Sequence, residues 1–119
     1  MRYWDTSALL PLVIREEGTD LAREWLGQDP VVITWGLTRV EMVSALERRT
    51  REGLIDRSQR RRALDVFERL FDAWHEVTDM LLVRGRAEAV LARQPVRAAD
   101  ACQIGSALLV ADGDPSFLD

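Results

Sequence analysis

Apolar residues follow two patterns along this chain: short unbroken runs, and longer segments in which they recur at helical spacing. The runs Met1–Trp4 and Val31–Ile33 predict buried strands of a parallel sheet, and residues 75–78 predict a short extended segment. Between the breaks at Glu17-Gly18, Gly53 and Gln94-Pro95, the spacing predicts helices over residues 7–15, 19–27, 35–51, 56–74, 79–93 and 98–111. Strands that alternate with helices predict an α/β fold, with a small parallel sheet flanked by helices.

The same pattern predicts which side chains are buried. Thr34 is expected to cap the helix that runs to about Arg51, whose buried stripe is expected to be Leu37, Val40, Val43 and Leu46. The helix over 98–111 carries one charged residue, Asp100, and is therefore expected to be buried nearly all round. The tryptophans are expected to pack in the core: Trp4, Trp25, Trp35 and Trp74.

Length and composition fit one globular domain over residues 1–119, with 47% apolar and 30% charged residues. The net charge is −4, whereas a domain that holds nucleic acid by overall charge is usually basic, so such binding would depend on local features. The single cysteine, Cys102, cannot form an internal disulfide, which indicates a cytoplasmic protein. The longest apolar run, Leu9–Ile14, is far shorter than the roughly 20 residues that cross a bilayer, so no membrane association is expected.

All 16 basic residues are arginines. The absence of lysine excludes Schiff-base chemistry, a phosphate-binding P-loop lysine and a lysine general base. It also argues against response-regulator receivers and haloacid-dehalogenase phosphatases, which combine an acidic pocket with a lysine. The Asp-x-Asp motif of the second class fails as well, because residue 7 is serine.

Three carboxylates occupy positions that suggest chemistry. Asp5 ends the first predicted strand, where it either caps the next helix or lies at the sheet edge where α/β folds build sites. Glu41 borders the apolar stripe of its helix, and either reaches water at the margin of the core or faces a polar cavity. Asp100 is either a first-turn acid favoured by the helix dipole or, in so apolar a helix, a carboxylate that faces a cation.

If these acids converge, their mutual repulsion requires a cation. Arg39 or Arg97 could supply it, and a divalent metal is the other solution. Because no His or Cys pair is nearby, oxygen ligands favour Mg²⁺ or Mn²⁺ over Zn²⁺. Such a centre implies metal-assisted hydrolysis of a phosphodiester.

Three segments, in this order, resemble those of PIN-domain ribonucleases, and most closely the VapC-type toxins of bacterial toxin–antitoxin pairs. They are Asp5-Thr6-Ser7-Ala8-Leu9, Thr38-Arg39-Val40-Glu41-Met42-Val43-Ser44-Ala45-Leu46, and Arg97-Ala98-Ala99-Asp100-Ala101 followed by Ser106-Ala107-Leu108. The resemblance covers nearly the whole chain. It implies a three-layer α/β domain, Mg²⁺- or Mn²⁺-dependent endonucleolytic cleavage of RNA, inhibition by a cognate antitoxin, and a homodimer.

By the same likeness, Asp5, Glu41 and Asp100 would be metal ligands, with Thr6 and Ser7 as supporting hydroxyl groups. The family usually has a fourth acid near the C-terminus, in a run like Phe-x-Ser/Thr-x-Asp. Here Phe117-Leu118-Asp119 begins that run and the chain ends. Either Asp119 replaces the fourth acid, or the chain is shorter than the natural product and lacks a final strand and helix. An incomplete acid set also keeps open a PIN-like scaffold without activity that binds a protein or RNA.

Two further features remain open at this point. The run Arg57 to Arg62 is the main concentration of positive charge, and it is a solvated helix face, an RNA-backbone contact or an antitoxin-docking surface. Trp35, where the family more often has a small polar residue, either packs in the core, which is the favoured interpretation, or stacks on a base.

Overall fold

A computed structural model describes residues 1–113 of the chain. It contains three short strands and six helices in an alternating order. The strands are β1 (Arg2–Tyr3), β2 (Val32–Trp35) and β3 (His75–Val77). The helices are α1 (Thr6–Val13), α2 (Thr19–Gln28), α3 (Thr38–Arg51), α4 (Arg57–Phe71), α5 (Met80–Leu91) and α6 (Ala98–Ala111). Each predicted element is present, with ends that differ by a few residues.

The strands form one parallel sheet in the order β1-β2-β3. Tyr3 pairs with Ile33, and Trp35 pairs with Val77, so β2 lies in the middle. All four residues of β2 are buried, which is why its sequence is a continuous apolar and β-branched run. Because the strands are parallel, their carboxyl ends meet at one edge of the sheet, where β1 leads into Asp5 and β2 leads toward α3.

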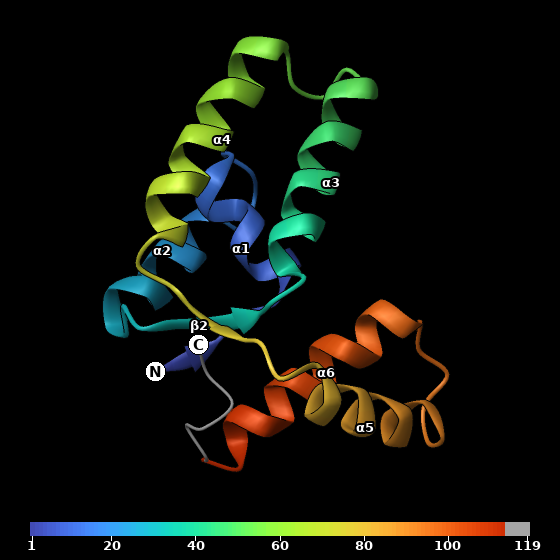
Figure 1. Cartoon of the computed structure of the whole chain (residues 1–119). Coiled ribbons are helices and arrows are strands. Elements are labelled where there is room, and N and C mark those ends of the chain that lie inside the picture. Colours follow the sequence, from blue (N-terminus) through green and yellow to red (C-terminus); the bar gives the residue numbers. More distant parts are fainter. Residues whose placement is uncertain (114–119) are drawn as a thin grey trace.

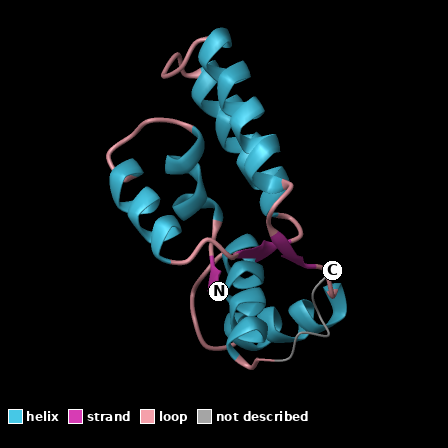
Figure 2. Ribbon diagram, turned by 90° about the vertical axis from the view of Figure 1, so that its left-hand side faces the viewer, coloured by secondary structure: helices cyan, strands magenta, loops and turns pink. Residues whose placement is uncertain are grey.

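Helices cover both faces of the sheet. Figure 1 shows α1 to α4 on one side of β2 and the α5–α6 pair on the other, and Figure 2 shows the same separation after a quarter turn. Successive strand residues point to opposite faces, so Val32 packs with Leu9, Met42 and Phe67, while Ile33 packs with the opposite cluster. That second cluster is Ile33, Trp35, Val77, Val83 and Leu109. The chain therefore has the expected three-layer α/β arrangement.

The α3–α4 hairpin projects from the sheet, and its ends follow local sequence signals (Figure 1). Gly53 adopts φ +75°, a conformation that glycine takes without steric cost, just after the C-cap Glu52. Asp56 then caps α4 in a capping box with Gln59, each side chain accepting from the other's backbone N–H. The sequence predicted this break correctly.

The close approach of α5 and α6 depends on Gly105. A Cβ built there would lie 3.0 Å from Ala87 N and 3.1 Å from the carbonyl oxygen of Val83. Because both neighbours are helix backbone, they cannot yield as a flexible side chain would. Gly105 thus permits the packing that fixes α6 against α5.

Several burial predictions were wrong. Thr34 is not a helix cap, because the strand continues through Trp35 and α3 begins only after Leu37. The buried residues of α3 are Thr38, Met42 and Leu46, so Leu46 agrees with the predicted stripe and Val43 packs partly buried against the core, whereas Val40 is 65% and Leu37 48% exposed. The helix α6 is not buried all round, since it packs on α5 and the sheet while Asp100, Ile104 and Leu108 remain exposed.

The tryptophans follow the prediction only in part. Trp4 and Trp35 are buried. Trp74 is half-buried and packs against Phe67 and Phe71. Trp25 is exposed at the edge of Trp4, with ring centroids 6.4 Å apart. None of the helices within residues 1–113 is long and apolar enough to cross a membrane.

Candidate functional site

The three singled-out carboxylates lie around one pocket. The pocket, of about 430 Å³, is lined by residues of α1, α3 and α6 and of the turn after β1. Its lining residues are Asp5, Thr6, Ser7, Leu10, Glu41, Ala45, Arg49, Asp100, Gln103 and Ile104. Residues that are nearly a hundred positions apart in sequence therefore share one cavity at the carboxyl edge of the sheet, and we call this cavity the acid pocket.

Asp5 both caps α1 and lies at the sheet edge, on the acid pocket. Its Oδ1 caps α1 by accepting from the backbone N–H of Ala8 at 3.0 Å, and it also accepts from the Ser7 hydroxyl at 3.0 Å. The side chain is exposed and lines the acid pocket. Capping thus fixes one oxygen of the carboxylate and leaves Oδ2 without a hydrogen bond from residues 1–113.

Glu41 faces the polar cavity instead of reaching bulk water at the margin of the core. It lies in the first turn of α3 and is half-buried. Its Oε1 accepts from Thr6 Oγ1 at 3.1 Å and from Gln103 Nε2 at 2.6 Å. As with Asp5, one oxygen is held by the protein while the other receives no hydrogen bond from the described residues.

Gln103 is the part of the pocket that the sequence did not reveal. Besides Glu41, its Nε2 donates to Thr38 Oγ1 at 2.9 Å, and Tyr3 donates its hydroxyl proton to Gln103 Oε1. Burial raises the pKa of the Tyr3 hydroxyl above its usual range, so the phenol stays protonated and remains a donor. A glutamine in an apolar helix, one turn after Asp100, was the available signal.

Asp100 is exposed in the first turn of α6, and no hydrogen bond or ion pair reaches it from residues 1–113. The expectation that the apolar helix buries this carboxylate was wrong, and its exposed place in the first turn agrees with the alternative of an acid favoured by the helix dipole. Because Asp100 is exposed, burial gives no reason to expect a cation beside it. Its position on the acid pocket, with two other carboxylates, gives that reason instead.

Neither arginine proposed as a counter-charge lines the acid pocket. Arg39 turns toward α4, where it pairs with Glu68 and lies over the rings of Phe67 and Phe71, 5.2 and 4.8 Å from their centroids. Arg97 is the exposed N-cap of α6. The pocket instead contains Arg49, which also pairs with Glu16 at 3.5 Å.

The donor set of the acid pocket suits a hard divalent cation. Three carboxylates supply oxygen ligands, and each has an oxygen that residues 1–113 leave without a hydrogen bond. However, no group of three or more His, Cys, Asp or Glu side chains within those residues is close enough to hold a metal ion as arranged. The carboxylate oxygens suit Mg²⁺ or Mn²⁺, and the three side chains have to move closer together to bind one ion.

The remaining predicted residues lie elsewhere. Asp119 lies outside the described residues. Trp35 is 2% exposed, which fits packing and leaves no free face for stacking. Cys102 is half-buried, and His75 is exposed in β3. Of the arginine run, Arg60 pairs with Glu47 across the α3–α4 hairpin, and Arg57, Arg60 and Arg61 line a pocket with Glu47 and Thr50.

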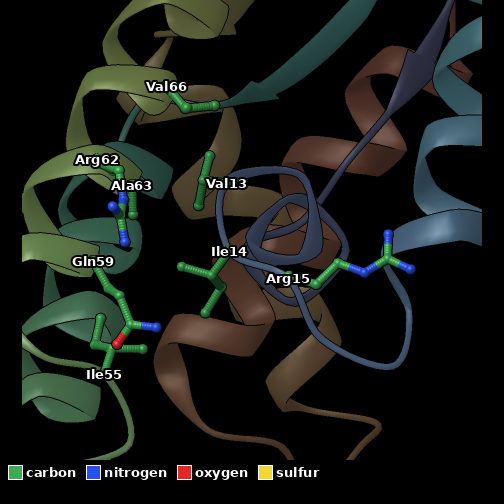
Figure 3. A pocket seen from close by; sticks show the side chains of 8 residues that line it. All are labelled: Val13, Ile14, Arg15, Ile55, Gln59, Arg62, Ala63 and Val66. Carbon is green, nitrogen blue, oxygen red and sulfur yellow. The ribbon is translucent and has the colours of Figure 1, made fainter.

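A further pocket, of about 260 Å³, lies between the end of α1 and α4 (Figure 3). Its walls are mostly apolar, with Gln59 and Arg62 at one side. Arg15 turns away from the other labelled side chains, consistent with its bidentate pair to Asp20 at 2.7 and 3.0 Å. Because no carboxylate lines this pocket, it offers no hydrolytic chemistry of the kind that the acid pocket offers.

The family model of the PIN domain matches residues 2–112, which is almost the entire described chain. The match spans β1 through α6 and so includes each element that lines the acid pocket. No curated protein matches the chain.

Proposed function

Because the chain belongs to the PIN domain family, we propose that it is an Mg²⁺- or Mn²⁺-dependent endoribonuclease that acts as the toxin of a type II toxin–antitoxin pair. PIN domains are generally nucleases, which gives the reaction class. One observation carries the assignment of the site: Asp5, Glu41 and Asp100, from three separate parts of the sequence, line a single pocket.

The protein's own residues prepare this pocket for a phosphodiester. Ser7 and the α1 backbone bind one oxygen of Asp5, while Thr6 and Gln103 bind one oxygen of Glu41, so the second oxygen of each carboxylate remains available to a ligand. Asp5, Glu41 and Asp100 would hold the divalent ion, which when bound would offset the negative charge that grows on the phosphate oxygens. Asp119 stays a sequence-based prediction for a fourth ligand.

Arg49 is the group that fits the phosphate itself. It is the one cation among the residues that line the acid pocket, and its pair with Glu16 at 3.5 Å is long and partly exposed. Such a surface pair contributes little, so the guanidinium can exchange Glu16 for a phosphate without a large loss. Arginine also suits bidentate phosphate contacts.

The toxin role, the antitoxin and the homodimer rest on the sequence resemblance to VapC-type toxins. The homodimer has one structural support: large apolar side chains are exposed on the packed pair α5 and α6, including Met80, Leu81, Leu82 and Leu108. Burying such side chains between two copies would be favourable. With RNA as substrate, the cytoplasm is the proposed location.

A second candidate function is a PIN-like scaffold that binds a partner without cleaving RNA. The observation that favours it is the spacing of the acids, since the described residues contain no group close enough to hold a metal as arranged. In that case the arginines of the α3–α4 hairpin would bind RNA or a protein partner while the acid pocket stays inert.

RNA cleavage by the purified, partner-free chain distinguishes these candidates. Wild type, Asp5→Asn, Asp100→Asn and the matched control Asp65→Asn, an exposed acid of α4, are incubated with RNA and Mg²⁺ or Mn²⁺. Cleavage by wild type and Asp65→Asn, lost in both site variants and with chelator, supports the ribonuclease. Cleavage that persists in Asp5→Asn and Asp100→Asn discards the site, and no cleavage by wild type supports the scaffold.

A further inference from the structure

We propose that an apolar pocket beside the acid pocket receives one nucleobase of the RNA strand, next to the phosphate that is cut. This inference rests on the proposed ribonuclease function and adds a contact to the base. The pocket, of about 330 Å³, is lined by Trp35, Leu37, Val40, Glu41, Ala98, Ala99 and Cys102, and we call it the apolar pocket.

The location of the apolar pocket favours an RNA base over a separate ligand. Glu41 lines both this pocket and the acid pocket, so the two cavities lie on either side of one side chain. The two pockets are also adjacent at the start of α6, where Ala98 and Ala99 line the apolar pocket and Asp100 lines the acid pocket. A nucleotide whose phosphate lies among the carboxylates would therefore have its base within reach of the apolar walls.

The chemistry of the walls favours an uncharged, weakly polar group over a charged one. Glu41 is the one charged residue among the lining residues, and its negative charge disfavours a phosphate within the apolar pocket itself. The other walls are aliphatic, aromatic or thiol, and Val40 and Leu37 are exposed. A nucleobase is the part of an RNA strand that gains by leaving water for such a surface.

Trp35 is the aromatic residue of this lining. Trp35 is nearly fully buried, and its Nε1–H has no hydrogen-bond partner within residues 1–113. A buried N–H donor without a partner costs free energy, and that cost is recovered only if the lining rearranges so that an acceptor reaches the indole. Ring nitrogens and carbonyl oxygens of nucleobases are such acceptors, whereas a purely aliphatic occupant has none.

Cys102 provides a direct measurement of occupancy, since it lines the apolar pocket and is the single cysteine of the chain. The rate of its alkylation by iodoacetamide is measured with Mg²⁺ and increasing concentrations of the four nucleoside 5′-monophosphates. Ribose 5-phosphate, which has the phosphate and the sugar without the base, is the matched probe. At about nine times the midpoint concentration of the preferred nucleotide, the rate should fall about tenfold, because the free fraction is then about one tenth.

A pair of variants locates the effect. Val40→Asn removes an apolar contact at the rim of the pocket and should raise the midpoint about fivefold. Leu54→Asn is the control, since Leu54 is 68% exposed against 65% for Val40 and lies in the turn between α3 and α4. It should leave the midpoint unchanged. Both side chains are exposed, so neither change is expected to unfold the chain.

The outcomes separate this inference from the proposed function. Protection by nucleotides but not by ribose 5-phosphate, weakened in Val40→Asn alone, supports the base pocket even if the same preparation cuts no RNA. No protection, or equal protection by ribose 5-phosphate, overturns it even if RNA is cut. Alkylation that slows with rising protein concentration and ignores nucleotides overturns it in favour of a second copy on this face.

Discussion

Gln103 Nε2 donates a hydrogen bond to Glu41 Oε1 at 2.6 Å, and this contact joins α6 to α3 at the centre of the acid pocket. The same amide nitrogen donates to Thr38 at 2.9 Å, while its carbonyl oxygen accepts from Tyr3 of β1. A single neutral side chain thereby links the first strand and two helices from distant parts of the sequence. The hydrogen bond from Gln103 holds the half-buried Glu41 side chain in one orientation.

Replacing Gln103 with leucine should weaken both stability and cleavage. The change leaves the Tyr3 hydroxyl and the Thr38 hydroxyl without this partner, at a cost of about 1–3 kcal/mol in the free energy of unfolding. Glu41 would lose its shorter hydrogen bond and its fixed position. Urea denaturation and the cleavage rate measure the two effects. Gln94→Leu, in the exposed turn before α6, is the control, and equal losses in both variants would contradict the role of Gln103.

Two substitutions of Asp5 separate its cap from its proposed catalytic role. Asparagine caps helices about as well as aspartate, so Asp5→Asn should leave the melting temperature nearly unchanged while cleavage falls about 100-fold or more. Asp5→Ala should also lose about 1 kcal/mol of stability, because the Ala8 N–H loses its acceptor. Thermal melts and cleavage rates are the measurements. Full activity in Asp5→Asn would leave Asp5 as a helix cap alone.

The α5–α6 packing predicts opposite signs for two glycine-to-alanine changes. Gly105→Ala places a methyl group against the α5 backbone and should destabilise the chain by about 1–3 kcal/mol. Gly85, in α5, has open space where its Cβ would lie, so Gly85→Ala should stabilise by up to about 1 kcal/mol through helix propensity. Denaturant unfolding of both variants tests this. Destabilisation by the two changes alike would mean that close packing at Gly105 is not the cause.

Tyr3 predicts a loss of stability at alkaline pH. Burial raises the pKa of its hydroxyl in the folded state above the value of about 10 expected in the unfolded chain. The unfolded state therefore releases its proton first as the pH rises above about 10, and stability falls from there upward. Tyr3 is the only tyrosine, so tyrosinate absorbance follows this group alone. Tyr3→Phe should show a shallower alkaline decline in stability, and an identical decline would exclude Tyr3 as its source.

The sequence predicted the order and type of all elements in residues 1–113, because periodicity and the breaks at Gly53 and Gln94-Pro95 are local signals. Prediction from the sequence failed where tertiary contacts decide which residues are buried and where a helix begins. The start of α3 after Leu37 depends on β2 extending to pair Trp35 with Val77, and the exposure of Val40 depends on which face of α3 packs on the core. The apolar composition of α6 suggested complete burial, but a helix beside a small sheet meets too few neighbours to be covered on all sides.

For the site, the spacing of charged residues identified Asp5, Glu41 and Asp100, and the structure places all three on one pocket. It did not identify Gln103, whose one signal is a polar amide in an apolar helix, or Arg49, which is one arginine among 16. Arg39, one of two candidate counter-charges, instead contacts Phe67, Phe71 and Glu68, and these contacts depend on how α3 packs on α4. The positions of Gln103, Arg49 and Arg39 follow only from the packing of α3, α4 and α6.

Mn²⁺ binding is the measurement that tests the central claim most directly, because it requires no substrate and no catalysis. Calorimetric titration of Mn²⁺ into wild type and into the control Asp65→Asn should give the same specific binding. The affinity should fall about tenfold or more in each of three variants, Asp5→Asn, Glu41→Gln and Asp100→Asn. Each of these changes removes one charged ligand from the acid pocket. Mn²⁺ binding that is absent in wild type, or unchanged in all three site variants, would contradict the account.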